Sequence, residues 1–242
     1  MSHRFFGALE TETRARLPAA EAEHARRVLR LRDGAEIQIL TEDGRSYAGQ
    51  LRFSEGEAFA EELVPLPSTE PPVDVTLYMG IPKGEKLELI SQKLTEIGVK
   101  RIVPVRTERC VAKIEPKEAE KKLSRPRRIA AEAQKQSGRS IAPEITDPVN
   151  IADLPELFKT HDRVFLLWEE ADGYHLSDAR RDTPDITDIA YIVGSEGGIS
   201  PKEAAFLKEA GAEYITLGPR ILRAETAAIA GAAAILTLWG DL

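Results

Sequence analysis

The stretch IVGSEGGISPKEA, residues 192–204, places three glycines around one glutamate, after an apolar run and before a proline. Glycine is costly inside regular structure, so three of them indicate a sharp turn or a close approach of the backbone to a ligand. Ser200, Pro201 and Glu203 fit the start of a helix, with the serine as N-cap and the glutamate completing a capping box. The stretch therefore predicts a strand-to-helix turn, where open α/β sheets bind ligands. A plain turn without a ligand stays an alternative at this point.

A second stretch of this kind follows at residues 214–231, YITLGPRILRAETAAIAG. An apolar strand ends at Gly218, and a short loop with two arginines leads into a helix that carries Glu225 near its start. This helix has one face of small side chains, made by Ala224, Ala227, Ala228, Gly231 and Ala232. Small side chains let another backbone come close. Two interpretations stay open: packing against a sheet, or contact with a partner helix in a homodimer.

The residue composition and the hydrophobic pattern of the chain change at residues 64–74, VPLPSTEPPVD, where four prolines favour an extended linker. Before it, short strand-like runs and the tight turn EDGRS at residues 42–46 predict a small β-rich domain over residues 1–70 that closes as a barrel. One helix is expected over residues 18–31. Its buried side is predicted to hold Ala22, Ala25, Val28, Leu29 and Leu31.

After the linker, apolar runs alternate with helical patterns over residues 73–242. Near-continuous apolar strands separated by helices predict a parallel sheet covered on both faces. A helical region is expected up to Ser137. Within it, Pro126 with Ser124 as a cap predicts the start of a new helix rather than a break.

Composition limits the class of protein. The chain has 242 residues, 42% hydrophobic content, one cysteine and four scattered histidines. These features predict a globular chain with no internal disulfide, no metal site and a cytoplasmic setting. No apolar run is long enough for a signal peptide or a membrane span. Dinucleotide-binding, P-loop and nucleophile-elbow motifs are absent, so those three site classes are not supported.

The net charge of −7 is not typical of a nucleic-acid binder, but its distribution is uneven. Residues 26–32 hold four arginines and no acid, and residues 113–139 hold nine Lys or Arg against four Glu. Two interpretations fit these basic segments: solvated helix faces, or an electrostatic footprint for nucleic acid.

The motifs also carry a resemblance. IVGSEGGISPKE and LGPRILRAETAAIAG resemble the ligand loops of SPOUT methyltransferases. KGEKLELISQKLTEIGVKRIVPV, AAEAQKQSGRSIAPEI, HRFF and HARRVLRLRDG resemble the ribosomal RNA small subunit methyltransferase E family, in the same order and over nearly the whole chain. Ser195 is a departure, because proline is more usual before Glu196.

This resemblance implies an α/β fold: a SPOUT-type parallel sheet with a C-terminal trefoil knot over residues 73–242, plus a small PUA-like β-barrel domain over residues 1–70 that binds RNA. It implies S-adenosyl-L-methionine as cofactor and methylation of N3 of a specific uridine in 16S rRNA, as one step of rRNA processing. The implied partners are the small ribosomal subunit and a second copy in a homodimer, with no membrane. Two alternatives are a methyltransferase of this fold acting on another RNA, and a non-catalytic RNA-binding assembly factor.

Site residues follow from the resemblance and from the residue chemistry. The candidate catalytic residues are Arg223, to favour the deprotonated uracil, with Glu196 or Glu225 as base or as the acid that orients the arginine. The candidate cofactor-binding residues are Leu167, Gly194, Glu196, Gly197, Gly198, Leu217, Gly218, Ile221, Leu222 and Arg223. The candidate RNA-binding residues are Arg4, Arg26, Arg27, Arg30, Lys83, Arg109, Lys113, Arg127, Arg128, Gln136 and Arg139.

Overall fold

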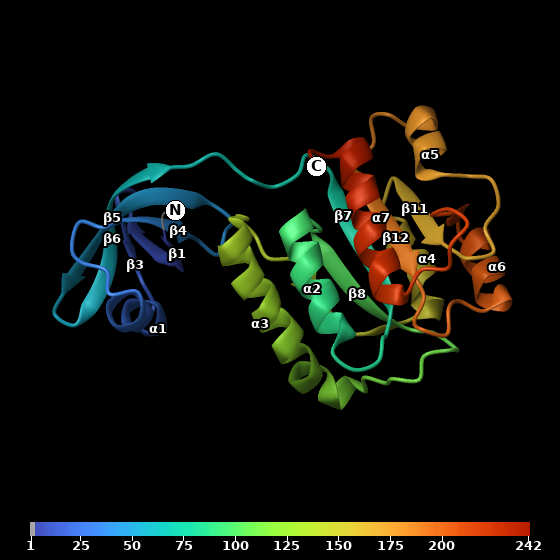
Figure 1. Ribbon diagram of the computed structural model, residues 1–242, viewed down its shortest axis with the longest axis horizontal. Helices are drawn as coiled ribbons and strands as arrows, with labels where there is room; N and C mark the ends of the chain where they lie inside the picture. Colours follow the sequence, from blue (N-terminus) through green and yellow to red (C-terminus); the bar gives the residue numbers. More distant parts are fainter. Residues whose placement is uncertain (1–2) are drawn as a thin grey trace. The chain divides into compact units, whose positions relative to one another are not determined.

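The computed structural model describes residues 3–242, and the chain divides into two compact units (Figure 1). The first unit comprises the residues up to Glu70 together with Gln134–Ile141. The second comprises Pro71–Ala133 and Ala142–Leu242. The division at Glu70 lies in the proline-rich stretch, whereas the return of residues 134–141 to the first unit was not expected from the sequence.

The first unit is built on a six-stranded sheet in the order β1-β4-β5-β6-β3-β2. All neighbouring strands are antiparallel except the parallel pair β1 and β4. The hairpin predicted around residues 42–46 joins β4 to β5 and is confirmed. The strands are β1 (His3–Phe6), β2 (Ala8–Thr11), β3 (Arg14–Arg16), β4 (Glu36–Leu40), β5 (Ser46–Ser54) and β6 (Glu57–Pro65).

The helix of this unit differs from the prediction. A short α-helix, α1 (Ala19–Glu23), passes directly into a π-turn, η1 (His24–Val28). The wider turn is closed by the Leu29 N–H donating to the His24 carbonyl at 3.0 Å. It rotates Val28 off the buried side, where an α-helix would have placed it, so Val28 is 65% exposed. The expectation that Val28 belongs to the core was therefore wrong.

Residues 134–141 are held in the first unit by hydrogen bonds. The Glu70 carboxylate accepts from Arg139 Nε at 3.1 Å, and from the backbone N–H groups of Ser140 at 2.8 Å and Ile141 at 3.0 Å. The guanidinium of Arg4 donates to the carbonyls of Lys135 and Gln136, both within this segment, at 3.2 Å each. The proline-rich stretch is thus pinned at its end and is not a free spacer.

The second unit is built on a parallel sheet in the order β10-β8-β7-β12-β11-β13, with β9 paired to β8. The predicted parallel sheet is confirmed. The strands are β7 (Asp74–Gly80), β8 (Arg101–Arg106), β9 (Glu144–Ile145), β10 (Val149–Asn150), β11 (Arg163–Leu167), β12 (Asp188–Val193) and β13 (Glu213–Ile215).

Helices cover both faces of this sheet (Figure 1). Residues of β7 alternate between the two cores: Leu77 packs on one side and Tyr78 on the other. One face carries α2 (Lys86–Ile97), α3 (Ala119–Ser137), α5 (Leu176–Asp182) and α7 (Ala224–Trp239); the other carries α4 (Leu154–Phe158) and α6 (Pro201–Glu209). Short 3-10 turns, η2 (Pro116–Glu118) and η3 (Ile151–Asp153), precede α3 and α4.

Helix α3 runs without interruption through Pro126, so the expectation of a new helix at this proline was wrong. Proline lacks the N–H that would donate to the carbonyl four residues earlier, and the helix loses that one bond. The Ser124 hydroxyl donates back to the Lys121 carbonyl at 2.8 Å and does not cap a new helix. The buried side chain of Pro126 indicates that packing offsets the lost backbone bond.

The small-residue face of α7 packs against the sheet. A Cβ atom on Gly231 would lie 2.5 Å from Leu167 Cδ1 on β11 and 3.1 Å from the Tyr191 ring on β12. The Tyr191 hydroxyl donates to the Ala228 carbonyl at 2.8 Å. Of the two interpretations of this face, packing against the sheet is confirmed, and the small residues by themselves give no argument for a dimer.

Replacing Gly231 by valine tests this packing. We expect Gly231→Val to lower the free energy of unfolding by about 1–3 kcal/mol, because the added methyl groups have no space beside Leu167 and Tyr191. Urea denaturation followed by circular dichroism measures the change. Ala233→Val, at a half-buried position of the same helix, is the matched control for the β-branched side chain. Equal unfolding midpoints for the two variants would contradict the tight contact.

Candidate functional site

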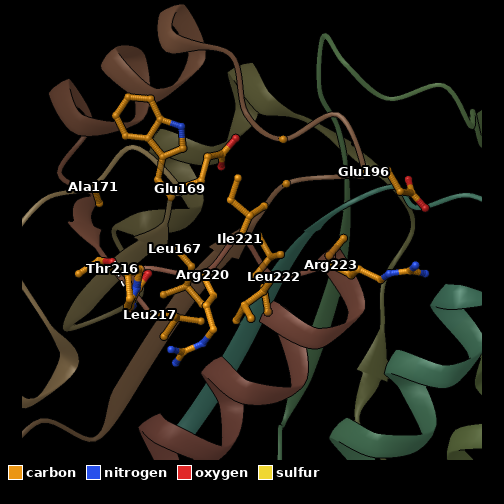
Figure 2. A pocket seen from close by; sticks show the side chains of 18 of the residues that line it. Leu167, Glu169, Ala171, Glu196, Thr216, Leu217, Arg220, Ile221, Leu222 and Arg223 are labelled. Atoms are coloured by element: carbon orange, nitrogen blue, oxygen red, sulfur yellow. Dashed lines mark hydrogen bonds between the residues drawn. The ribbon is translucent and has the colours of Figure 1, made fainter.

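A cavity of about 760 Å³ lies in the second unit, where β11, β12 and β13 end (Figure 2). Its walls come from three separate segments: residues 167–175 after β11, residues 193–198 after β12, and residues 216–224 between β13 and α7. Lys86, from the first turn of α2, and Ala227 of α7 complete the lining. The last two segments contain the glycine-rich stretches quoted in the sequence analysis, and the structure brings both of them together with the segment after β11 around one cavity.

The glycines after β12 are required because the backbone folds closely on itself. A Cβ on Gly194 would lie 2.7 Å from the backbone carbon of Gly198. Gly198 has φ +70°, and a Cβ there would lie 2.6 Å from Glu169 Oε1. Gly197 faces away from the cavity, where a Cβ would meet Arg109 Cβ at 2.8 Å. Of the predicted cofactor residues, Gly197 alone is not part of the cavity lining within residues 3–242.

The predicted capping box after this loop is confirmed. The Ser200 hydroxyl accepts from the Glu203 N–H at 3.3 Å, and the Glu203 carboxylate accepts from the Ser200 N–H at 3.1 Å. The second carboxylate oxygen of Glu203 accepts from the Glu108 N–H at 2.7 Å. The start of α6 is therefore joined to the loop after β8, which fixes the glycine loop between them.

The loop before α7 presents backbone donors beside the cavity. Gly218 has φ +101°, and its N–H donates to Thr216 Oγ1 at 3.1 Å. Among residues 3–242, no backbone or side-chain group accepts from the N–H groups of residues 220–223. Leu217 and Leu222 are half-buried, and Ile221 is 89% exposed. The loop thus combines apolar surface with unpaired donors, which suits a ligand that has both apolar and acceptor groups.

Three charged side chains from different elements meet at the rim. Lys86 Nζ lies 3.0 Å from Glu196 Oε1 of the glycine loop and 3.0 Å from Glu225 Oε2 in the first turn of α7. The Lys83 N–H also donates to Glu196 Oε1 at 3.0 Å. Both carboxylates predicted as catalytic therefore share one lysine.

The pKa values of this group follow from its contacts. Burial acts to raise the pKa of Glu196, but hydrogen bonds from its own N–H, from Lys86 and from the Lys83 N–H lower it overall. The Glu225 pKa is lowered by its own N–H and by Lys86, and Glu225 and Glu196 raise the pKa of Lys86. Both glutamates are charged at neutral pH. A carboxylate with a lowered pKa is a weak proton acceptor, which favours the orienting role over the base.

The two arginines of the loop extend in different directions. Arg223 is the N-cap residue of α7, is exposed, and extends to the same side of the cavity as Glu196 (Figure 2). Arg220 extends to the side of Leu217 (Figure 2). The charge of Arg223 also contributes to the lowered pKa of Glu225. The predicted catalytic residues Arg223, Glu196 and Glu225 thus lie in one region.

The predicted RNA-binding residues are divided between the two units. Arg4, Arg26, Arg27, Arg30, Gln136 and Arg139 belong to the first unit; Lys83, Arg109, Lys113, Arg127 and Arg128 belong to the second. Several have partners within the chain: Arg4 with Gln38, Arg26 over the Phe53 ring, Arg27 with Glu23, Arg109 with the Gly197 carbonyl, Arg127 with Asp147, Arg128 with Glu132 and Arg139 with Glu70. The side chains of Arg30, Lys83, Lys113 and Gln136 are exposed.

Several residues that line the cavity were not selected from the sequence, and three of them bear on its chemistry: Lys86, Trp168 and Glu169. The position of Lys86 in the sequence could have indicated a role, because a lysine in the first turn of a helix is disfavoured by the helix dipole and is expected only where another contact stabilises it. Glu169 follows a strand and offers no pattern of its own. Trp168 contacts Tyr214, and its Nε1 is buried with no acceptor among residues 3–242. A donor that is buried without an acceptor in the chain is rare, and this one belongs to a residue that lines the cavity.

The chain is also similar to known proteins. A family model described as an RNA methyltransferase domain matches residues 69–236. A ribosomal RNA small subunit methyltransferase E from Bacillus subtilis (strain 168) is 31% identical over 221 residues, covering 89% of this chain and 86% of that protein. The protein of the same name from Aquifex aeolicus (strain VF5) is 33% identical over 217 residues, covering 88% and 90%. This chain belongs to the ribosomal RNA small subunit methyltransferase E family.

Solved structures agree over the whole length. A ribosomal RNA small subunit methyltransferase E from Neisseria gonorrhoeae, bound to S-adenosyl methionine, has a TM-score of 0.86, 31% identity and 100% coverage of both chains. A methyltransferase from Legionella pneumophila, also in complex with this cofactor, has a TM-score of 0.86, 30% identity and 100% coverage of both chains. The α/β architecture of this member is therefore that of crystallised methyltransferases.

Residues 3–242 contain no helix that is both long and apolar enough to cross a membrane. They also contain no group of three or more His, Cys, Asp or Glu side chains that could hold a metal ion. The thiol of Cys110 is free and lies 3.2 Å from Thr107 Oγ1.

The lowered pKa of Glu225 predicts a pH-dependent contribution to stability. The pKa of Glu225 in the folded state lies below its unfolded value of about 4.3, so the ionised carboxylate stabilises the fold at pH values above 4.3. This stabilisation is lost as the pH falls through the folded-state pKa. We expect Glu225→Gln to be less stable than the wild type at pH 7, by an amount that is unchanged at pH 6 and shrinks below about pH 4.3. Urea unfolding across this range measures it.

Glu209→Gln, at an exposed position of α6, is the control for loss of a carboxylate without the lysine. A stability difference between wild type and Glu225→Gln that grows as the pH falls would contradict the lowered pKa.

Proposed function

We propose that this family member binds S-adenosyl-L-methionine in the cavity and methylates N3 of one uridine in the 16S rRNA of the small ribosomal subunit. The single observation that carries the proposal is the convergence of the three loops around one cavity in the unit matched by the RNA methyltransferase model. Relatives of this name and two cofactor-bound neighbours support it. We further propose that these loops form the trefoil knot of the SPOUT fold and that the first unit is a PUA-like barrel.

The residues present fit this cofactor. The free N–H groups of residues 220–223 suit the ring nitrogens and carboxylate of the ligand, and Leu167, Leu217 and Leu222 supply apolar walls. The buried Trp168 Nε1 offers one more donor. Gly194, Gly198 and Gly218 let the loops follow the ligand without side chains in the way. When bound, the cofactor supplies an electrophilic methyl group on a sulfonium.

The residues of the protein must bring the uracil of the RNA into a form that can accept that methyl group. Neutral N3 carries a proton and is a poor nucleophile. A nearby cation lowers the pKa of an acid, and Arg223 is an exposed cation on the same side of the cavity as Glu196. Because Glu196 and Glu225 are charged and bound to Lys86, they serve as the acids that orient the site, and Arg223 favours the uridinate.

The target base must leave its stack, because N3 lies on the pairing edge. The exposed cations of both units, including Arg30 and Lys113, supply phosphate contacts, so binding of 16S rRNA is expected to weaken steeply with salt. A homodimer and a cytoplasmic location stay predictions; sedimentation at micromolar concentration would detect a species of two chains.

The two alternative functions place different requirements on the cavity. A methyltransferase acting on another RNA would use the same cavity and modify a different nucleotide. A non-catalytic assembly factor would not need the free N–H groups and the buried Trp168 donor at the cavity. The second alternative is therefore the less favoured.

Cofactor binding is measured by calorimetry and by tryptophan fluorescence. We expect one S-adenosyl-L-methionine per chain and a change in emission, because Trp168 lines the cavity. The second tryptophan, Trp239, is buried and donates to the Thr183 carbonyl, so Trp168→Phe should remove the optical change while the heat of binding persists. Absence of heat at high protein concentration would favour the non-catalytic alternative.

The methylated nucleotide is found by incubating the protein and labelled cofactor with small ribosomal subunits. We expect label in 16S rRNA at one uridine. A methyl group on N3 blocks pairing, so reverse transcription should stop beside that uridine. Free tRNA is the comparison substrate, and label on tRNA in preference to the subunit would reject the rRNA assignment.

Removing the charge of Arg223 tests its role. We expect Arg223→Met to lower the methyl-transfer rate by about 100-fold, a typical loss for one group that stabilises developing charge. The pH at which the rate levels off should rise in this variant, because the cation no longer lowers the N3 pKa. Arg220→Met removes a neighbouring charge that extends elsewhere, and an equal loss in both variants would contradict a specific role for Arg223.

A further inference from the structure

We propose that Lys86 is a positioning residue that ties two walls of the cavity together and so sets the affinity for the cofactor. This inference rests on the proposed function. The lysine lies on α2, which is remote in sequence from the three loops. Its contacts single it out.

The geometry places one cation between two carboxylates that come from different elements at the cavity rim. Glu196 belongs to the loop after β12, and Glu225 belongs to the first turn of α7, directly after the loop from β13. Lys86 Nζ is 3.0 Å from an oxygen of each. Among residues 3–242, neither glutamate forms an ion pair with any other cation. One side chain therefore joins both walls.

The environment makes this contact matter more than a surface pair. The exposed fractions of the three side chains are 28% for Lys86, 25% for Glu196 and 15% for Glu225. The Glu225 oxygen that lies 3.0 Å from Lys86 Nζ is Oε2, which is buried and has no other polar partner among the described residues, so the lysine charge is its compensation. Exposed pairs contribute little, but a half-buried carboxylate left without its cation is costly.

Without the lysine, two half-buried carboxylates would lie close together at the cavity rim with no cation between them. Like charges at close range disfavour joint ionisation, so one of them would take up a proton at a higher pH than in the wild type. Repulsion at higher pH would also separate the loops that carry Gly194 and Leu222. Affinity for the cofactor then becomes weaker and dependent on pH.

The matched control lies on the same helix. Lys93 Nζ contacts Glu96 Oε1 at 2.9 Å, with side chains 39% and 31% exposed, and it does not line the cavity. Lys93→Met removes a lysine and an ion pair from α2 without touching either wall. Lys86→Arg keeps the charge with a different shape, so it separates the need for charge from the need for geometry.

The experiment measures the dissociation constant of S-adenosyl-L-methionine by calorimetry between pH 6 and 8.5. We expect Lys86→Met to weaken binding by about tenfold at pH 7 and to give a dissociation constant that varies with pH, whereas the wild type and Lys93→Met vary little. Lys86→Arg should recover part of the affinity. In the Glu225→Gln background the same lysine change should cost less, because only one carboxylate remains.

The outcomes separate the two claims. Unaltered affinity and a flat pH dependence in Lys86→Met would overturn this inference alone. A wild-type chain that binds no cofactor would overturn the proposed function and this inference with it. Circular dichroism and urea unfolding show whether Lys86→Met is folded. If it is not folded, the cofactor affinities of Lys86→Arg, Glu225→Gln and the double variant test the inference instead. Additive effects of the two substitutions on affinity would overturn the proposal that Lys86 joins the two walls.

Discussion

Parallel strands of one sheet end at the same edge, and the site depends on this constraint. β11, β12 and β13 are neighbours in the same sheet, although their loops are separated by many residues in the chain. Because all three run in one direction, the segments that leave them must converge. The cavity, its free backbone donors and its charged rim all follow from that convergence. α6 and α7 then start beside it, and their first turns hold the loops in place.

The cavity also depends on close packing of the backbone. Gly194 and Gly198 approach each other within the loop, and Gly231 brings α7 onto β11 and β12. In both places a side chain would displace a wall of the cavity. The glycines are therefore explained first by contacts inside the protein, and the space for a ligand is a result of those contacts.

The sequence predicted the elements with strong patterns and missed those that depend on tertiary contacts. The Ser200 capping box, the hairpin at residues 42–46 and the alternation of the second unit are local or periodic, and these predictions were confirmed. Val28 and Pro126 were wrong because a π-turn and a buried helical proline depend on surroundings that no local pattern describes. Lys86 was missed because its partners lie more than 100 residues away. The trefoil knot that the resemblance implies has no signal in periodicity, and it stays a prediction.

The return of residues 134–141 to the first unit has a consequence for how the protein is made. During translation the six strands of this unit are synthesised early. The hydrogen-bond donors of the Glu70 carboxylate, on Arg139, Ser140 and Ile141, are synthesised about 70 residues later. The nascent first unit therefore carries an unpaired carboxylate until α3 has been synthesised. Its completion is coupled in time to the assembly of the catalytic half, so the amino-terminal 70 residues are an incomplete module when expressed as a fragment.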